Sequence, residues 1–174
     1  NPSHTGLGNE LAYDSNDSWE TPYGNVELDK DFAEHLKIPV SDVEQKREHA
    51  GEVMAPMLKY FIPYEFKIAP VTLTMQNYRN ASRLAHAIYE SNQILNKNVF
   101  IIASSDFSHF VPPKVGAERD QYVLDKIEHL DAKGVEQVIA DHYISVCGYG
   151  PIMALIEYSK LIAQNPKTKI LRKG

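Results

Sequence analysis

The apolar run at residues 99–103 (Val-Phe-Ile-Ile-Ala) continues directly into the polar hexapeptide at residues 104–109 (Ser-Ser-Asp-Phe-Ser-His), with no turn residue between them. Such a run is typical of a strand buried on both faces, as in a parallel sheet covered by helices. A strand that ends in serine, aspartate and histidine delivers these groups to the carboxyl edge of the sheet, where open α/β folds bind their ligands. We therefore expect the functional residues at this edge.

The segments around this run predict an α/β domain. Apolar residues recur at helical spacing over residues 77–95, and this helix would connect a strand at residues 66–73 to the strand at residues 98–103 as a βαβ unit. The remaining pattern predicts helices at 29–36, 48–61, 114–130, 133–140 and 148–163, short extended segments at 18–24 and 25–28, and a last strand at 168–171. With no repeat or linker, residues 1–174 are expected to form a single domain.

The composition limits the kinds of partner and the cellular compartment that we expect for this protein. The 174 residues carry 23 acidic and 18 basic side chains spread along the chain, for a net charge of -5. This balance supports neither a nucleic-acid-binding stripe nor a patch for anionic membranes. No apolar stretch approaches the roughly 20 residues of a membrane span, and the single cysteine, Cys147, excludes an internal disulfide. We expect a cytoplasmic location.

Ligand-type side chains concentrate at four predicted element boundaries. Imidazole, carboxylate and thiolate are the ligands of a borderline divalent metal, and a site built from loop ends leaves a coordination position open for substrate. No Cys-x-x-Cys pair, His-Glu-x-x-His helix or glycine-rich phosphate loop accompanies them, so spacing alone does not define a metal site. The four places are Ser3 with His4, Glu48 with His49 and Glu52, Asp106 with His109, and Cys147 with Gly148.

Each of these residues also has an ordinary structural interpretation. His4 could be an exposed turn histidine, and Asp106 could cap the segment after the strand by accepting backbone hydrogen bonds. Glu48 and Glu52 could form the solvated first turn of a helix. Cys147 could be a small buried hydrophobe, although its position just before a predicted helix favours a reactive or ligating thiolate. From residue types alone, both interpretations stay open.

Five motifs, taken in order, resemble the Memo family, whose prokaryotic members are called AmmeMemoRadiSam system protein B. They are Asn-Pro-Ser-His-Thr-Gly at 1–6, Thr-Pro-Tyr-Gly at 21–24, Glu-His-x-x-Glu at 48–52, the strand and hexapeptide at 99–109, and Cys-Gly-x-x-Pro-Ile at 147–152. The resemblance implies a three-layer α/β/α fold with a mostly parallel central sheet, similar to class III extradiol ring-cleaving dioxygenases. It also implies a metal pocket at the sheet edge.

Carried over residue by residue, the resemblance implies that His4 and Cys147 are metal ligands, with the thiolate where the dioxygenases carry a carboxylate. Asp106 would be a ligand or would orient one, His109 would donate or accept a proton near the substrate, and His49 would lie near the pocket. Iron(II) is the expected metal, and thiolate and imidazole also suit copper and zinc.

The same resemblance implies that more of the domain lies on both sides of this chain. In the family, a second histidine ligand lies in a Pro-His-Ala-Gly type loop upstream of the position of Asn1, and further strands follow the position of Gly174. We therefore expect an internal portion of a longer domain, with the sheet incomplete at both termini and an incomplete site.

Three functions stay open at this point. The first is a metal-dependent redox or oxygenase-type enzyme acting on an unidentified small molecule. The second is a non-enzymatic module that binds a peptide or another partner, and the third is a maturation partner of a radical-SAM protein. Fold alone does not decide among them.

Overall fold

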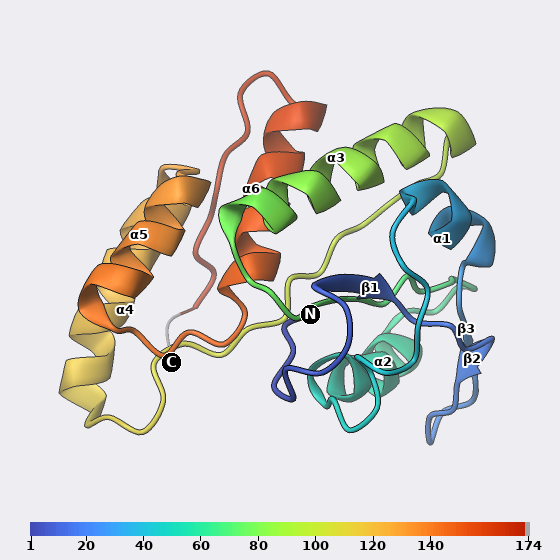
Figure 1. Ribbon diagram of the computed structural model, residues 1–174, viewed down its shortest axis with the longest axis horizontal. Helices are drawn as coiled ribbons and strands as arrows, with labels where there is room; N and C mark the ends of the chain where they lie inside the picture. Colours follow the sequence, from blue (N-terminus) through green and yellow to red (C-terminus); the bar gives the residue numbers. More distant parts are fainter. Residues whose placement is uncertain (173–174) are drawn as a thin grey trace.

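The computed structural model describes residues 1–172 and has a mixed α/β structure (Figure 1). Its helices are α1 (Lys30–Leu36), α2 (Ala50–Phe61), α3 (Tyr78–Leu95), α4 (Pro113–Glu128), α5 (Ala132–His142) and α6 (Tyr149–Ile162). Its strands are β1 (Leu11–Tyr13), β2 (Ser18–Trp19), β3 (Val26–Glu27) and β4 (Val71–Leu73). The expected α/β class is confirmed at this level.

The named strands form two small antiparallel sheets. β1 pairs with β4, with Leu11 opposite Leu73, and β2 pairs with β3. Parallel neighbours occur within residues 1–172 only as single bridges, one of which places Pro2 beside Leu73. The backbone N–H of Ser3 donates to the Leu73 carbonyl at 3.1 Å, so the chain runs along β4 until just before His4. The expected mostly parallel, three-layer sheet is not formed among these residues.

The sequence predicts a buried strand at residues 98–103, but these residues form no strand within the described chain. Val99 and Ile101 pack against the core, whereas Phe100 is 88% exposed and Ile102 is 39% exposed. This alternation is that of an extended segment with one covered face. A strand also needs a neighbouring backbone, and no backbone hydrogen bond joins residues 98–103 to another described segment. The lack of a pairing partner is the physical reason for the difference.

The other two strand predictions are corrected in the same way. The strand expected at residues 66–73 is shortened to β4, and residues 168–171 form no strand in the described part of the chain. Residues 66–70 have a neighbouring backbone only as a single bridge between Ile68 and Leu28, and Pro70 has no N–H with which to continue a ladder. The two short extended segments at 18–24 and 25–28 are confirmed, since they contain β2 and β3.

The longest helix, α3, organises the core. Asn77 caps its start by accepting a backbone hydrogen bond at 2.8 Å, and Asn96, in the left-handed conformation with φ of 48°, ends it. Leu84 and Ile88 lie on its buried face, and burying side chains of this size is worth about 1.5–3 kcal/mol each. α3 packs against α6 and α1, as Figure 1 shows. This arrangement holds the start of α6 close to the end of β4.

The other expected helices are confirmed with small shifts at their ends. α4 and α5 lie side by side, and α5 in turn contacts α6 (Figure 1). Pro113 and Pro151 lie in the first turns of α4 and α6, where proline removes no intrahelical hydrogen bond. Among residues 1–172, no helix combines the length and apolar character needed to cross a membrane.

Candidate metal centre

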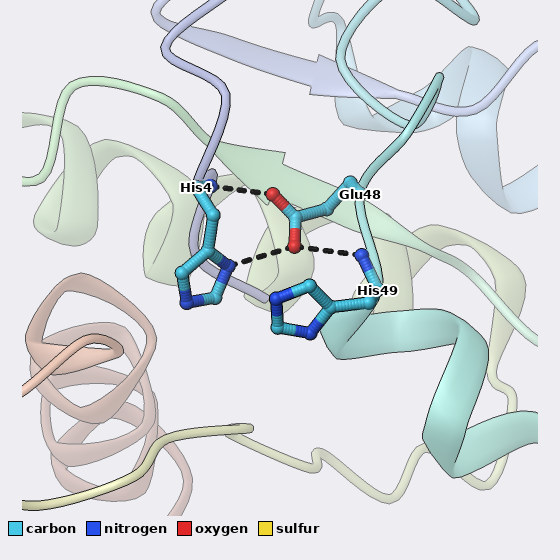
Figure 2. Close-up of side chains that lie close together, drawn as sticks. All are labelled: His4, Glu48 and His49. Carbon is cyan, nitrogen blue, oxygen red and sulfur yellow. Dashed lines mark hydrogen bonds and ion pairs between the residues drawn. The ribbon is translucent and has the colours of Figure 1, made fainter.

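Three ligand-type residues from two distant segments meet at one place (Figure 2). His4 follows the segment that runs along β4, and Glu48 and His49 immediately precede α2. One ligand atom from each of the three side chains lies within 4.8 Å of the others. We call these residues the His4–Glu48–His49 group. Among residues 1–172, it is the one place where three or more histidine, cysteine or acidic side chains lie close enough to share an ion.

The Glu48 side chain has no exposed surface, and its carboxylate accepts three backbone hydrogen bonds and contacts the His4 ring. Its Oε1 atom lies 2.8 Å from His4 Nδ1, 2.9 Å from the His49 N–H nitrogen and 3.1 Å from that of Ala50. Its Oε2 atom accepts from the backbone N–H of His4. Burial opposes the negative charge, but the hydrogen bonds from His4 and Ala50 outweigh it and hold the pKa of Glu48 below its ordinary value of 4.5.

The two imidazoles of the group lie against each other. The ring centroids of His4 and His49 are 4.4 Å apart, and the ring planes are inclined by 26°. Figure 2 shows both rings on the same side of the Glu48 carboxylate, with the His4 ring joined to it by a dashed line. Both histidines are exposed at this surface, so the group has one buried acidic side and one side open to solvent.

A second cluster joins the polar hexapeptide to the segment before α6. The backbone N–H of Cys147 donates to the Asp106 carbonyl at 3.1 Å, and the Asp106 N–H donates to Cys147 Sγ at 3.0 Å. His109 binds Ser145 through its backbone, and its Nε2 lies 3.9 Å from Asp106 Oδ2. His109 Nδ1 is buried without a hydrogen-bond partner among the described residues, whereas the Asp106 carboxylate is 87% exposed.

Close backbone contacts hold the second cluster together and connect it to the first. The Gly148 N–H donates to Ser105 Oγ at 2.9 Å, and a Cβ at position 148 would lie only 2.1 Å from the Ser104 carbonyl oxygen. Only glycine therefore fits at position 148. The Ser104 hydroxyl is 3.5 Å from the carbonyl of Ala50, the residue after His49. The hexapeptide thus lies beside the start of α2.

Gln76, just after β4, is a second tie to this region. Its Nε2 donates to the Cys147 carbonyl at 2.7 Å, and its Oε1 accepts from the Gly150 N–H at 2.8 Å. Gly150 is in the first turn of α6, where backbone N–H groups have no partner within the helix. Gln76 therefore caps α6 from another element while fixing the carbonyl of Cys147.

The structure thus brings the five predicted site residues together in two sets. His4 lies with His49, and Asp106 lies with His109 and Cys147. The prediction that His4, Cys147 and Asp106 share one ion is not tested by these contacts and stays a prediction.

The sequence leaves the role of Glu48 open between a ligand-type residue and a solvated helix turn with Glu52. Glu52 is exposed on α2, whereas Glu48 is buried just before the helix. Sequence reasoning missed Gln76, whose only signal is a polar side chain shortly after the predicted strand at residues 66–73. Glu48 and Gln76 both act on residues more than 40 positions away in the chain, which a local pattern does not reveal.

Comparisons with known proteins agree with the resemblance. The sequence model of the family described as Memo-like protein matches residues 1–173. A MEMO1 family protein of Methanobrevibacter smithii is 39% identical over 170 residues, covering 94% of this chain and 60% of the relative. One from Saccharolobus islandicus strain M.14.25 is 37% identical, covering 91% of this chain and 58% of the relative. One from Methanothermobacter thermautotrophicus is 33% identical, covering 92% and 60%. The chain spans three fifths or less of the length of these relatives.

Proposed function

Because this chain belongs to the Memo-like protein family, we propose that it binds a divalent metal ion at the His4–Glu48–His49 group. The observation that carries the proposal is the exposed His4 imidazole beside the buried Glu48 carboxylate and the His49 ring, with one ligand atom of each within 4.8 Å of the others. Imidazole is a common ligand of borderline divalent metals, and a carboxylate commonly lies beside such a ligand.

The charge of the group fits a cation. Glu48 is buried and stays ionised, and its one partner with a basic side chain is His4 within the described part of the chain. Backbone N–H groups stabilise this negative charge but do not neutralise it. A divalent cation bound at the adjoining imidazoles would lower the free energy of that charge. Iron(II) is the proposed ion, and the ligand types also suit zinc and copper.

We extend the proposal to the second cluster, whose Cys147 thiolate and Asp106 carboxylate would complete the coordination. The contact between Ser104 and Ala50 supports this extension, because it joins the segment of Asp106 to the residue after His49. The Asp106 N–H donates to Cys147 Sγ, so the sulfur is the acceptor in this contact, and metals bind cysteine as the thiolate.

The proposed activity is a metal-dependent redox or oxygenase-type reaction on a small molecule. A bound iron(II) would supply activation of dioxygen or of a substrate oxygen. His109 would hold or release a proton at Nε2 near the open side of the site, and its buried Nδ1 is free of protein partners among residues 1–172. Both the activity and the substrate class are proposals.

The three-layer fold of class III extradiol dioxygenases is part of the same proposal. Residues 98–103 already have one face on the core, and in the three-layer fold their exposed face, with Phe100 and Ile102, would be covered by a further layer. A neighbouring strand on their unpaired backbone would convert this segment into the strand that the sequence predicts. In this arrangement the hexapeptide would end at a sheet edge, as the sequence analysis expects.

Binding of a peptide is the second candidate function, favoured by an exposed aromatic surface. Tyr23, Tyr60, Phe61 and Tyr64 are each more than half exposed, and the rings of Tyr23 and Tyr60 are 4.9 Å apart. Exposed aromatic clusters are common at protein interfaces. A role as partner of a radical-SAM protein is a further proposal that rests on the family resemblance alone.

Calorimetric titration of the metal-free protein with zinc(II), and with iron(II) under anaerobic conditions, tests the metal proposal. We expect one ion per chain. Changing a residue that only supports a ligand weakens metal binding by roughly tenfold or more, and we expect His4→Ala, which removes a ligand, to weaken it further. Cys147→Ala tests the extension to the second cluster in the same way. His86→Ala is the matched control, because His86 is an exposed helical histidine that contacts only the Ser82 carbonyl.

Unchanged affinity in His4→Ala would contradict the metal proposal. Unchanged affinity in Cys147→Ala alone would remove the extension to the second cluster and leave the His4–Glu48–His49 group in place. Dioxygen uptake by the iron-loaded protein in the presence of catechol-like compounds then separates an oxygenase from a binding module.

A further inference from the structure

We infer that Glu48 is a positioning residue rather than a metal ligand: it holds the neutral His4 ring in the tautomer protonated at Nδ1 and so presents Nε2 to the ion. The role of the ion rests on the proposed function. The tautomer of His4 is a property of the metal-free protein and can be tested by itself.

The hydrogen bonds of Glu48 leave it little capacity to bind an ion. Its Oε1 atom accepts from the N–H groups of His49 and Ala50, which match the two lone pairs of a carboxylate oxygen, and it also lies 2.8 Å from His4 Nδ1. Its Oε2 atom accepts from the His4 backbone, and the side chain has no exposed surface through which an ion could approach. Coordination by Glu48 would require these bonds to break.

Two of these donors belong to the start of α2 and have no other acceptor among the described residues. The N–H groups of His49 and Ala50 precede the first helical hydrogen bonds, and the His49 side chain provides no cap. Turning Glu48 toward an ion would leave them unpaired beside a buried residue, since Ala50 is only 9% exposed. Glu48 is therefore held in place by the helix that it caps.

The tautomer of His4 follows from the chemistry of this acceptor. Both carboxylate oxygens of Glu48 already accept backbone N–H groups, so we assign Glu48 as the acceptor in this contact too, with the hydrogen on the His4 Nδ1 that lies 2.8 Å from Oε1. In a neutral imidazole, the lone pair is then on Nε2. A metal-binding histidine is commonly oriented by such a carboxylate on its other nitrogen.

The stacking of His49 supports His4 as the primary imidazole ligand. Imidazole lone pairs lie in the plane of the ring, and the two planes are inclined by only 26° with centroids 4.4 Å apart. Rings arranged face to face do not direct their lone pairs to one point. His49 therefore packs on the face of the His4 ring and fixes the plane of that ring. Glu48 fixes the direction in which Nδ1 points within that plane.

The test is a long-range proton–nitrogen NMR spectrum of the metal-free protein labelled with ¹⁵N-histidine, recorded where the imidazoles are neutral. Three histidines serve as internal references, because their Nδ1 atoms face backbone carbonyls at 2.7–2.9 Å: His35, His86 and His129. We expect His4 to show the same Nδ1-protonated pattern as these references. A His4 signal protonated at Nε2 would overturn the inference without any metal being added.

Variants then test whether Glu48 causes the pattern. Glu48→Ala should shift His4 to a mixture of tautomers, and Glu48→Gln, which keeps an oxygen that can accept from Nδ1, should restore the Nδ1-protonated form. Glu52→Gln on exposed α2 is the control for loss of a nearby acidic charge. Unchanged reference signals report that a variant is folded. An unchanged His4 tautomer in folded Glu48→Ala would overturn the inference.

Titration of the wild-type protein with zinc(II) separates the positioning role from the proposed function. We expect zinc to move the His4 Nε2 resonance while Nδ1 keeps its proton, and Glu48→Ala to weaken zinc binding about 10- to 100-fold. Zinc on Nδ1 would overturn the inference, because the bond to Glu48 would have to break. No response of any histidine to zinc would refute the proposed metal site and leave the tautomer result to stand.

Discussion

Replacing Gln76 with alanine should lower the free energy of unfolding by about 2–4 kcal/mol. The side chain makes two hydrogen bonds that join the end of β4 to the start of α6, at 2.7 Å to the Cys147 carbonyl and 2.8 Å to the Gly150 N–H. Gly150 is buried, and each buried polar group left without a partner costs roughly 1–3 kcal/mol. Two such groups account for the expected loss. Cys147 is only half-buried, so the cost of leaving its carbonyl unpaired lies near the lower limit of this range.

The variant Gln76→Glu separates the contributions of the two hydrogen bonds to stability. The carboxylate can still accept from the Gly150 N–H, and a negative charge at a helix N-terminus is favourable by about 0.3–1 kcal/mol. The bond to the Cys147 carbonyl is lost, because two acceptor oxygens would face each other. We expect this variant to lose about half as much stability as Gln76→Ala, roughly 1–2 kcal/mol.

Urea unfolding followed by circular dichroism measures these losses, with Gln137→Ala as the matched control. Gln137 is exposed on α5 and bonds only to Asp141 one turn later, so its removal should change stability by less than about 0.5 kcal/mol. If Gln76→Ala were no more destabilising than Gln137→Ala, the reasoning about the cap of α6 would be wrong. If Gln76→Glu lost as much as Gln76→Ala, the part assigned to Gly150 would be wrong.

Two further predictions concern charged groups outside the site. Burial opposes ionisation of Glu44, but hydrogen bonds from Asn9 hold its pKa below the ordinary value of 4.5. Its carboxylate therefore stabilises the fold above about pH 4.5, and this contribution is lost as the pH falls through the lower folded-state pKa. Glu44→Gln should flatten that decline in urea unfolding curves measured across acidic pH, and an equally steep decline would contradict the assignment. Asp29 caps α1 by accepting from the Phe32 N–H at 3.1 Å and also binds Lys97 Nζ at 2.7 Å. Asp29→Ala should cost about 1–2 kcal/mol in the same assay, and a cost near zero would show that the cap contributes nothing.

The helices could be predicted because their determinants are local. The apolar spacing over residues 77–95, an asparagine cap and a left-handed asparagine at the end define α3 without reference to the rest of the chain. The strand at residues 98–103 depends on a partner backbone that no local pattern can supply. Its alternation of covered Val99 and exposed Phe100 is present, but the hydrogen-bonded ladder is not formed among residues 1–172.

The site was predictable in its residue types and not in its geometry. His4, His49 and Cys147 stood out because imidazole and thiolate are rare and chemically distinctive. The role of Glu48 depends on complete burial and on a partner 44 positions away. An adjacent glutamate and histidine before a helix give no sign of that burial, because the same dipeptide is equally suited to a solvated turn. Hydrogen bonds between polar groups that are distant in the sequence are therefore the part of the site that local patterns do not predict.

The close approach of Gly148 to the Ser104 carbonyl has a consequence for how the gene can vary. A methyl group at position 148 would lie 2.1 Å from that oxygen, so every missense change there must push the hexapeptide away from the cysteine segment. At Gly116 in α4, by contrast, a Cβ would meet its nearest neighbour, Val111, at an ordinary 3.5 Å. Alanine is therefore acceptable at position 116 and excluded at position 148. Among descendants of this protein, we expect position 116 to change freely and position 148 to remain glycine.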